Sequence, residues 1–218
     1  MGAVQLPIEQ RFVLFNIDWD TYVTISDKLG ERNIRINYDG VNLEFMSTSL
    51  EHERAKKLLA RLLETVTEEM DIDILGGGSM TCRRQDLERG FEPDECYWIA
   101  QEAQMRGRED IDLTRDPPPD LMLEIEISRS FVDRLAIAAR LGVPEVWRWD
   151  SETLRIMVLG SDGQYTESQR SRALPFLPVA ELVRFLRPDT IQSETKLLRS
   201  FRNWVREQMA RGWGDATT

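Results

Sequence analysis

Asp120-Leu-Met-Leu-Glu-Ile-Glu-Ile127 is the stretch that most constrains the fold, because every second residue from position 121 to position 127 is apolar. Strand side chains alternate between two faces, so the pattern predicts a strand with Asp120, Glu124 and Glu126 on one face. Glu124 and Glu126 would lie about 7 Å apart, and carboxylates this close repel unless something neutralises them. A divalent cation such as Mg²⁺ or Mn²⁺ suits oxygen ligands. The alternative is the solvated face of an antiparallel sheet.

The sequence around this strand predicts a sheet with helices packed against it. A helix over 130–141 ends at Gly142 and Pro144, and a strand over 146–149 follows. Strand, helix and strand together have the length of a crossover between parallel strands. With further strands over 95–99 and 154–159, the predicted class is α/β (α+β) with a mixed sheet.

The rest of the chain predicts peripheral elements. They are a helix over 18–29, hairpin strands over 34–37 and 41–46, a helix opened by the capping box Thr48 to Glu51, short strands over 72–75 and 79–83, and helices over 180–186 and 193–209. We therefore expect an N-terminal extension at 1–17, one domain at 18–186 and a C-terminal amphipathic helix within 187–218. This helix would pack on its own domain by default; a partner subunit is the next choice, and a basic rim for DNA the third.

Composition narrows the class of protein. The chain has 218 residues and a net charge of −10, which argues against a non-specific grip on nucleic acid, although the segment 184–211 is basic. No apolar run is long enough to span a membrane, and no secretory signal is visible. We therefore expect Cys82 and Cys96 to be reduced thiols in a cytoplasmic protein, and the single histidine argues against a zinc site.

Asp94 is a second acidic residue of interest, since it follows Pro93 at the entrance to the strand over 95–99. A carboxylate on one strand and a Glu-X-Lys pattern on its neighbour are the arrangement with which nucleases hold a divalent metal. The metal polarises the scissile phosphate and lowers the pKa of an attacking water. The alternative is that Asp94 is an ordinary turn residue after proline.

Four blocks of sequence carry a family resemblance. They are Gly78-Ser-Met-Thr-Cys-Arg-Arg-Gln-Asp-Leu-Glu-Arg-Gly90, Glu92-Pro-Asp-Glu-Cys-Tyr-Trp-Ile99, Asp116-Pro-Pro-Pro-Asp-Leu-Met-Leu-Glu-Ile-Glu-Ile-Ser128 and Gly142-Val-Pro-Glu-Val-Trp-Arg-Trp-Asp150. In this order they resemble a large bacterial family of putative restriction endonucleases, a domain of unknown function with the PD-(D/E)XK fold, over residues 18 to 186. The resemblance implies a restriction-endonuclease-like mixed sheet flanked by helices, and a Mg²⁺- or Mn²⁺-dependent endonuclease that cuts DNA.

The resemblance also implies roles for individual residues. Asp94 and Glu124 match the family's acidic metal ligands. Glu126 stands where the fold usually has its lysine, and it could be a third ligand, a water-orienting group or a solvated residue. Arg134 stands where this family's lysine has moved to the next helix, and Ala138 stands where a tyrosine is usual. A guanidinium stays protonated, so Arg134 could stabilise transition-state charge but could not act as a general base.

Arg134 and His52 each have a structural alternative. Arg134 could be a charge on the helix surface, or could neutralise Glu124 or Glu126 without metal. His52 matches a histidine at the start of the family's first core helix, and helical geometry places it about 60° from Ala55, on the apolar side. A lone histidine there is more often a satisfied structural residue than a metal ligand.

The function predicted from these residues is a metal-dependent endonuclease with DNA as its substrate and no membrane partner. A homodimer is expected, because cutting two strands is natural for two sites. The alternative is a catalytically inactive nuclease fold that serves as a binding or assembly module, which the net charge of −10 and the absent lysine favour. A shared cation requires Asp94, Glu124 and Glu126 to converge within about 5 Å.

Overall fold

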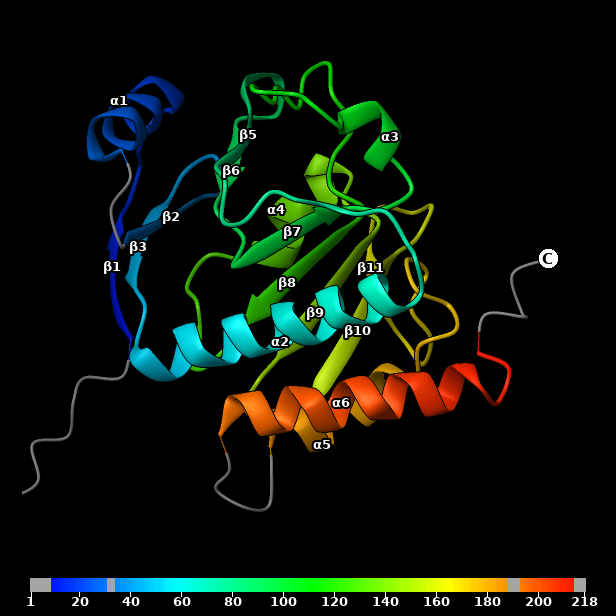
Figure 1. Cartoon of the computed structure of the whole chain (residues 1–218). Helices are drawn as coiled ribbons and strands as arrows, with labels where there is room; N and C mark the ends of the chain where they lie inside the picture. The colour runs from blue at the N-terminus through cyan, green and yellow to red at the C-terminus, as the bar shows by residue number, and fades with distance from the viewer. Residues whose placement is uncertain (1–8, 31–33, 188–192, 214–218) are drawn as a thin grey trace, which may run out of the picture.

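A computed structural model describes residues 9–30, 34–187 and 193–213 of the chain. Figure 1 shows two β-sheets, with helices on both faces of the larger one. No helix in these ranges is long and apolar enough to cross a membrane.

The larger sheet holds the strand predicted from the acidic stretch. Its order is β11-β10-β9-β8-β7-β4, and only the β8–β9 pair is parallel among the described strands. The strands are β4 (Leu75–Gly76), β7 (Glu95–Trp98), β8 (Leu121–Ile125), β9 (Glu145–Trp149), β10 (Leu154–Leu159) and β11 (Tyr165–Ser168). The helix α4 (Arg134–Leu141) makes the predicted crossover from β8 to β9. The mixed sheet flanked by helices is therefore confirmed.

The smaller sheet is antiparallel, in the order β1-β3-β2-β6-β5. Its strands are β1 (Gln10–Leu14), β2 (Ile34–Tyr38), β3 (Leu43–Ser47), β5 (Cys82–Arg84) and β6 (Arg89–Phe91). The helix α1 (Trp19–Leu29) packs on it through Tyr22, whose ring stacks on Tyr38 with centroids 4.7 Å apart. β1 lies within residues 1–17, where the sequence predicts no strand.

Two long helices cover one face of the larger sheet, α2 (Leu50–Glu69) and α6 (Glu194–Met209) (Figure 1). The N-cap of α2 is Ser49, which accepts a hydrogen bond from the His52 backbone N–H, so the predicted capping box at Thr48 is wrong by one residue. The short elements are α3 (Glu102–Met105), α5 (Val183–Leu186) and the 3₁₀ turns η1 (Gln85–Leu87) and η2 (Val179–Leu182).

β8 is buried on both faces. Its odd-numbered residues pack in the core beneath α2 and α6, and Met122 packs in a second core with Ile137 of α4. The face that carries Glu124 is therefore covered by α4, and the alternative of a solvated face is wrong. Glu124 needs another explanation than contact with water.

The ends of β8 differ from the predicted strand over 120–127. Asp120 precedes the strand, and its carboxylate accepts hydrogen bonds from the backbone N–H groups of Ile99, at 2.7 Å, and Gln101, at 3.0 Å. The strand ends at Ile125. Only Glu124 of the three acidic residues thus lies inside β8, and Asp120 has a structural role at its entrance.

Candidate active site

Asp94 lies fully buried just before β7 and joins three elements. Its Oδ1 is 2.8 Å from Nε2 of His52 on α2, and its Oδ2 accepts a hydrogen bond of 2.7 Å from the backbone N–H of Ile125 on β8. Both carboxylate oxygens are therefore fixed in direction. Asp94 is more than the turn residue that Pro93 alone would predict.

Glu124 lies in the middle of the same region and is only 6% exposed. Its Oε2 is 2.6 Å from the Nη2 of Arg134, the first residue of α4. The same Nη2 is 4.0 Å from Oδ2 of Asp94, so one guanidinium reaches both carboxylates. Oε1 of Glu124 is buried without a hydrogen-bond partner among the described residues.

The two carboxylates of this cluster have pKa values that shift in opposite directions. Burial opposes ionisation of Asp94, but the charge of Arg134 and the hydrogen bond from His52 outweigh it and lower its pKa. Burial raises the pKa of Glu124, the Arg134 charge only partly offsets this, and Asp94 raises it further. Glu124 thus holds its negative charge poorly here unless a further cation approaches.

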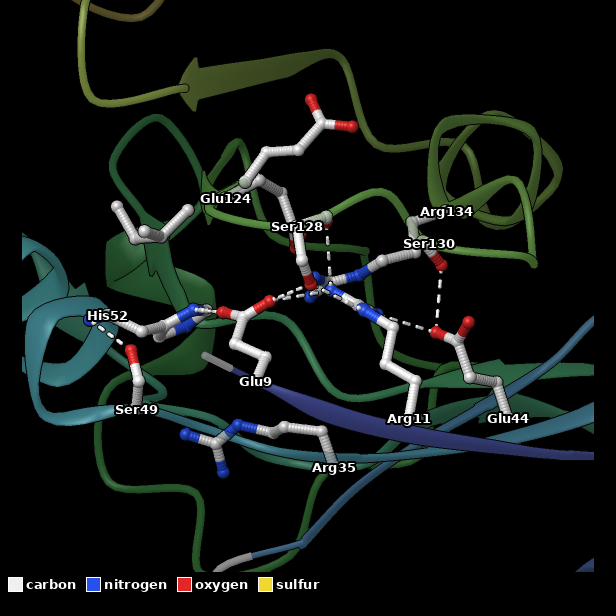
Figure 2. A network of polar contacts seen from close by, with 12 residues as sticks. Glu9, Arg11, Arg35, Glu44, Ser49, His52, Glu124, Ser128, Ser130 and Arg134 are labelled. Carbon is white, nitrogen blue, oxygen red and sulfur yellow. Dashed lines mark hydrogen bonds and ion pairs between the residues drawn. The ribbon is translucent and has the colours of Figure 1, made fainter. Parts of the chain in front are cut away.

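His52 is fully buried, and Figure 2 shows its ring beside the carboxylate of Glu9. Its Nε2 faces Asp94 and its Nδ1 contacts Glu9. Burial lowers the pKa of His52, but the hydrogen bonds to Asp94 and Glu9 outweigh it and raise the pKa to about 9. A protonated imidazole donates from both nitrogens and cannot bind a metal, so this geometry suits a positioning role.

Glu126 does not join this cluster. It follows the end of β8 and forms an ion pair with Arg148 of β9, with a third of its side chain exposed. In the described part of the chain, no group of three or more His, Cys, Asp or Glu side chains is placed to hold a metal. The structure thus brings Asp94, Glu124, Arg134 and His52 together and leaves Glu126 apart.

A second layer of polar residues, which no sequence pattern predicts, surrounds the site (Figure 2). Arg11 of β1 donates hydrogen bonds to Glu44 of β3, at 2.8 Å, and to Ser128 Oγ, at 2.9 Å. It also pairs with Glu9, which contacts Ser128. Arg11 stands in a short stretch without clear alternation, so nothing in the pattern of β1 marks it as a site residue.

Glu44 holds the loop that leads from β8 to α4. Its carboxylate accepts hydrogen bonds of 2.8 Å from Ser130 Oγ and 2.7 Å from the Phe131 backbone N–H. These contacts keep residues 130 to 133 outside the helix, which begins at Arg134 rather than at the predicted residue 130. The start of α4 in turn aims Arg134 at Glu124.

A cavity of about 250 Å³ opens beside Glu124, between the end of β8, the following loop and α4. Four arginines are among its lining residues: Arg11, Arg129, Arg134 and Arg148. Glu124, Glu126 and Asp133 also line the cavity, so its basic side chains outnumber its acidic ones by one, and this excess favours an anionic ligand.

The donors near this cavity fit a hydrated divalent cation in part. Mg²⁺ keeps several waters and is commonly held by one or two carboxylates. Glu124 supplies an oxygen without a partner among the described residues, and each Asp94 oxygen retains a second lone pair. Two carboxylates of this kind could hold such an ion, with water completing its coordination.

Comparison with known proteins identifies the family. The family described as Uma2, putative restriction endonuclease, matches residues 19–189. The chain is also similar to the crystal structure of a putative nuclease belonging to DUF820 from Anabaena variabilis ATCC 29413, with 14% identity over 85% of this chain and 99% of that chain and a TM-score of 0.48. A search of the curated proteins finds no match. The family expected from the four sequence blocks is confirmed, and the chain belongs to the Uma2 family of putative restriction endonucleases.

Proposed function

We propose that this protein is a divalent-metal-dependent nuclease that hydrolyses DNA phosphodiester bonds, with Asp94 and Glu124 as the metal-holding carboxylates. The observation that carries the proposal is the buried Oε1 of Glu124, which has no partner among the described residues and belongs to a residue that lines the arginine-rich cavity. An isolated buried carboxylate oxygen is costly unless a cation or a donor reaches it.

The residues of the chain would divide the work of hydrolysis. A bound Mg²⁺ or Mn²⁺ would polarise the phosphate and lower the pKa of the attacking water. His52 and the Ile125 N–H hold Asp94 in direction. Arg134 stays charged and donates to phosphate oxygens as negative charge develops on them. Glu126 would act at the edge of the site, through a bridging water, once its ion pair with Arg148 has broken.

The test is cleavage of DNA with Mg²⁺ or Mn²⁺ by the wild-type protein, Asp94→Asn and Glu124→Gln. Each substitution keeps the side-chain shape and removes the charge that holds the metal. We expect cleavage to fall at least about a hundredfold in both variants, as for loss of one electrostatic group in an active site. Equal cleavage by all three proteins would contradict the proposal.

A second candidate is an inactive nuclease fold that binds or assembles. The ion pair of 2.6 Å between Arg134 and Glu124 favours it, because this pair neutralises Glu124 without metal. Calorimetric titration with Mn²⁺ separates the two candidates. Heat of binding that disappears in Glu124→Gln supports the nuclease, and no heat at millimolar metal supports the inactive module.

We further propose a homodimer in the cytoplasm as the working form. Two copies would supply one site for each strand of a duplex. Cys82 and Cys96 are both free thiols, which suits a reducing compartment. Light scattering after size-exclusion chromatography measures the mass, and a monomer at micromolar concentration would contradict the dimer.

A further inference from the structure

The depth of the candidate site restricts which form of DNA can reach it. Glu124 is 6% exposed and the side chain of Arg134 is 10% exposed, so a phosphate must enter the cavity of about 250 Å³ to meet them. A duplex is stiff over roughly 150 base pairs and carries its phosphates on a regular cylinder. A strand with unpaired nucleotides bends freely, so one of its phosphates can enter such a cavity while the base of that nucleotide stays at the rim.

The charges around the site favour approach from the side of this cavity. Three of its four lining arginines pair with carboxylates, namely those of Glu44, Glu124 and Glu126. Arg129 is exposed and makes no ion pair with any residue that the structure describes. It is the cation at the mouth that is available to a phosphate.

The balance of basic and acidic side chains differs between the two sides of the site. A neighbouring hollow along α4 shares Arg148 and Asp133 with the cavity and adds Arg89, Arg140 and Asp39, so its lining holds three basic and two acidic side chains. The wide hollow on the other side, next to Arg35, carries more acidic than basic side chains. A nucleic acid backbone would be repelled there and attracted along α4.

An exposed aromatic pair stands at the rim of the cavity. Phe131 lines the cavity and is 59% exposed, and Phe15 is 58% exposed. Their rings meet edge-on, with centroids 5.4 Å apart and planes at 86°. An edge-on pair covers one face of one ring at most, which leaves ring surface on which a nucleobase can stack.

We propose that the cavity beside Glu124 binds an unpaired nucleotide of single-stranded DNA, with its phosphate at Arg129 and its base stacked on Phe131. Binding at this subsite would place the next phosphodiester of the strand beside Glu124 and Arg134, and this part of the proposal rests on the proposed function. Binding itself needs no metal. The substrate class would then be single-stranded DNA, or a duplex that is unwound locally so that each strand enters one of the two sites of the proposed dimer.

The test is fluorescence anisotropy with a labelled oligothymidylate strand and with a duplex of the same length, in EDTA so that nothing is cut. We expect the strand to bind more tightly than the duplex. Phe131→Ala should weaken strand binding at least about fivefold, and Phe131→Trp should retain it. Arg129→Gln should reduce the slope of log K against log salt by about 0.7.

Matched controls lie elsewhere on the chain. Phe12 is 62% exposed on β1 and, by strand alternation, points to the opposite face from Arg11. Arg199 is exposed on α6. Phe12→Ala and Arg199→Gln should leave strand binding unchanged. Equal weakening by Phe131→Ala and Phe12→Ala, or a duplex bound as tightly as the strand, would overturn the subsite.

Failure of the subsite and failure of the nuclease are distinguishable. Tight strand binding that depends on Phe131, in a protein that never cuts DNA with Mg²⁺ or Mn²⁺, supports the subsite and refutes only the nuclease. Cleavage that depends on Glu124 and proceeds at the wild-type rate in Phe131→Ala supports the nuclease and overturns only the subsite.

Discussion

At the residue scale, Arg134 stands where two buried carboxylates would otherwise repel each other. It contacts Glu124 at 2.6 Å and lies 4.0 Å from Asp94. The guanidinium therefore supplies the neutralisation that a divalent cation would also supply. If both cations serve the same carboxylates, removing one should increase the effect of the other.

Arg134→Ala tests this competition. The variant leaves Glu124 buried without its cation, and we expect a loss of about 3 kcal/mol of unfolding free energy in EDTA. Mn²⁺ should then raise the melting temperature more in Arg134→Ala than in the wild type, because a ligand stabilises the folded state by its affinity for it. Differential scanning fluorimetry over a Mn²⁺ series measures the shift. Equal shifts in both proteins would contradict shared carboxylates.

The sequence predicts the identity of the inner residues better than their partners. Asp94 and Glu124 stand in recognisable blocks, Arg134 lies between two of these blocks, and the structure brings the three residues together. Glu126 lies apart because β8 ends before it and Arg148 of the neighbouring strand pairs with it. An ion pair between strands depends on their register, which a single sequence does not specify.

At the element scale, α6 is fixed to α2 by charge as well as by its apolar side. Glu69 at the end of α2 accepts hydrogen bonds of 2.6 Å from both Arg202 and Arg206. Leu197, Phe201 and Val205 of α6 pack into the core of the larger sheet. This packing on its own chain corresponds to the default reading of the amphipathic pattern.

The α2–α6 contact should respond to pH. The hydrogen bond from Arg206 and the partner Arg202 lower the pKa of Glu69. A lowered pKa in the folded state means that the stabilisation is present above the unfolded value, near 4.5, and is lost as pH falls through the folded value. Glu69→Gln should therefore cost less than about 1 kcal/mol at neutral pH and flatten the acid limb of the stability curve. Urea unfolding from pH 7 to pH 3 measures it, and an unchanged acid limb would contradict the contact.

The elements also show where pattern reading fails. The crossover from β8 through α4 to β9 follows from the length and apolar content of its parts, and it is confirmed. The sequence predicts no strand at β1, because Gln10 to Leu14 shows neither alternation nor helical periodicity, and its strand conformation depends on pairing with β3. When a strand forms because a neighbouring strand pairs with it, its own sequence need not show a strand pattern.

At the scale of the whole molecule, the site lies where the two sheets meet. Arg11 and Glu44 come from the smaller sheet, while Ser128 and Ser130 follow β8 of the larger one. The hydrogen bonds among them connect the sheets directly beside Glu124. We therefore expect that a substitution which breaks these hydrogen bonds between the sheets also changes the shape of the cavity.

Arg11→Gln tests how much these hydrogen bonds between the sheets stabilise the fold. The side chain of Arg11 is 13% exposed, and its loss removes charged hydrogen bonds to two carboxylates, so we expect a cost of about 2 kcal/mol. The matched control is Arg83→Gln, whose ion pair with Asp27 is 36% and 57% exposed and should cost less than about 0.5 kcal/mol. Denaturation by urea compares the two. A cost no larger for Arg11 than for Arg83 would show that the network does not hold the sheets.

The position of β1 has a consequence for how this domain is delimited. The family match begins at residue 19, yet Glu9 and Arg11 lie before it and touch His52 and Glu44. A recombinant fragment cut at the limits of the match would lack both side chains and carry an altered site. Natural chains that share the matched region but differ upstream can therefore diverge in activity without any change inside it.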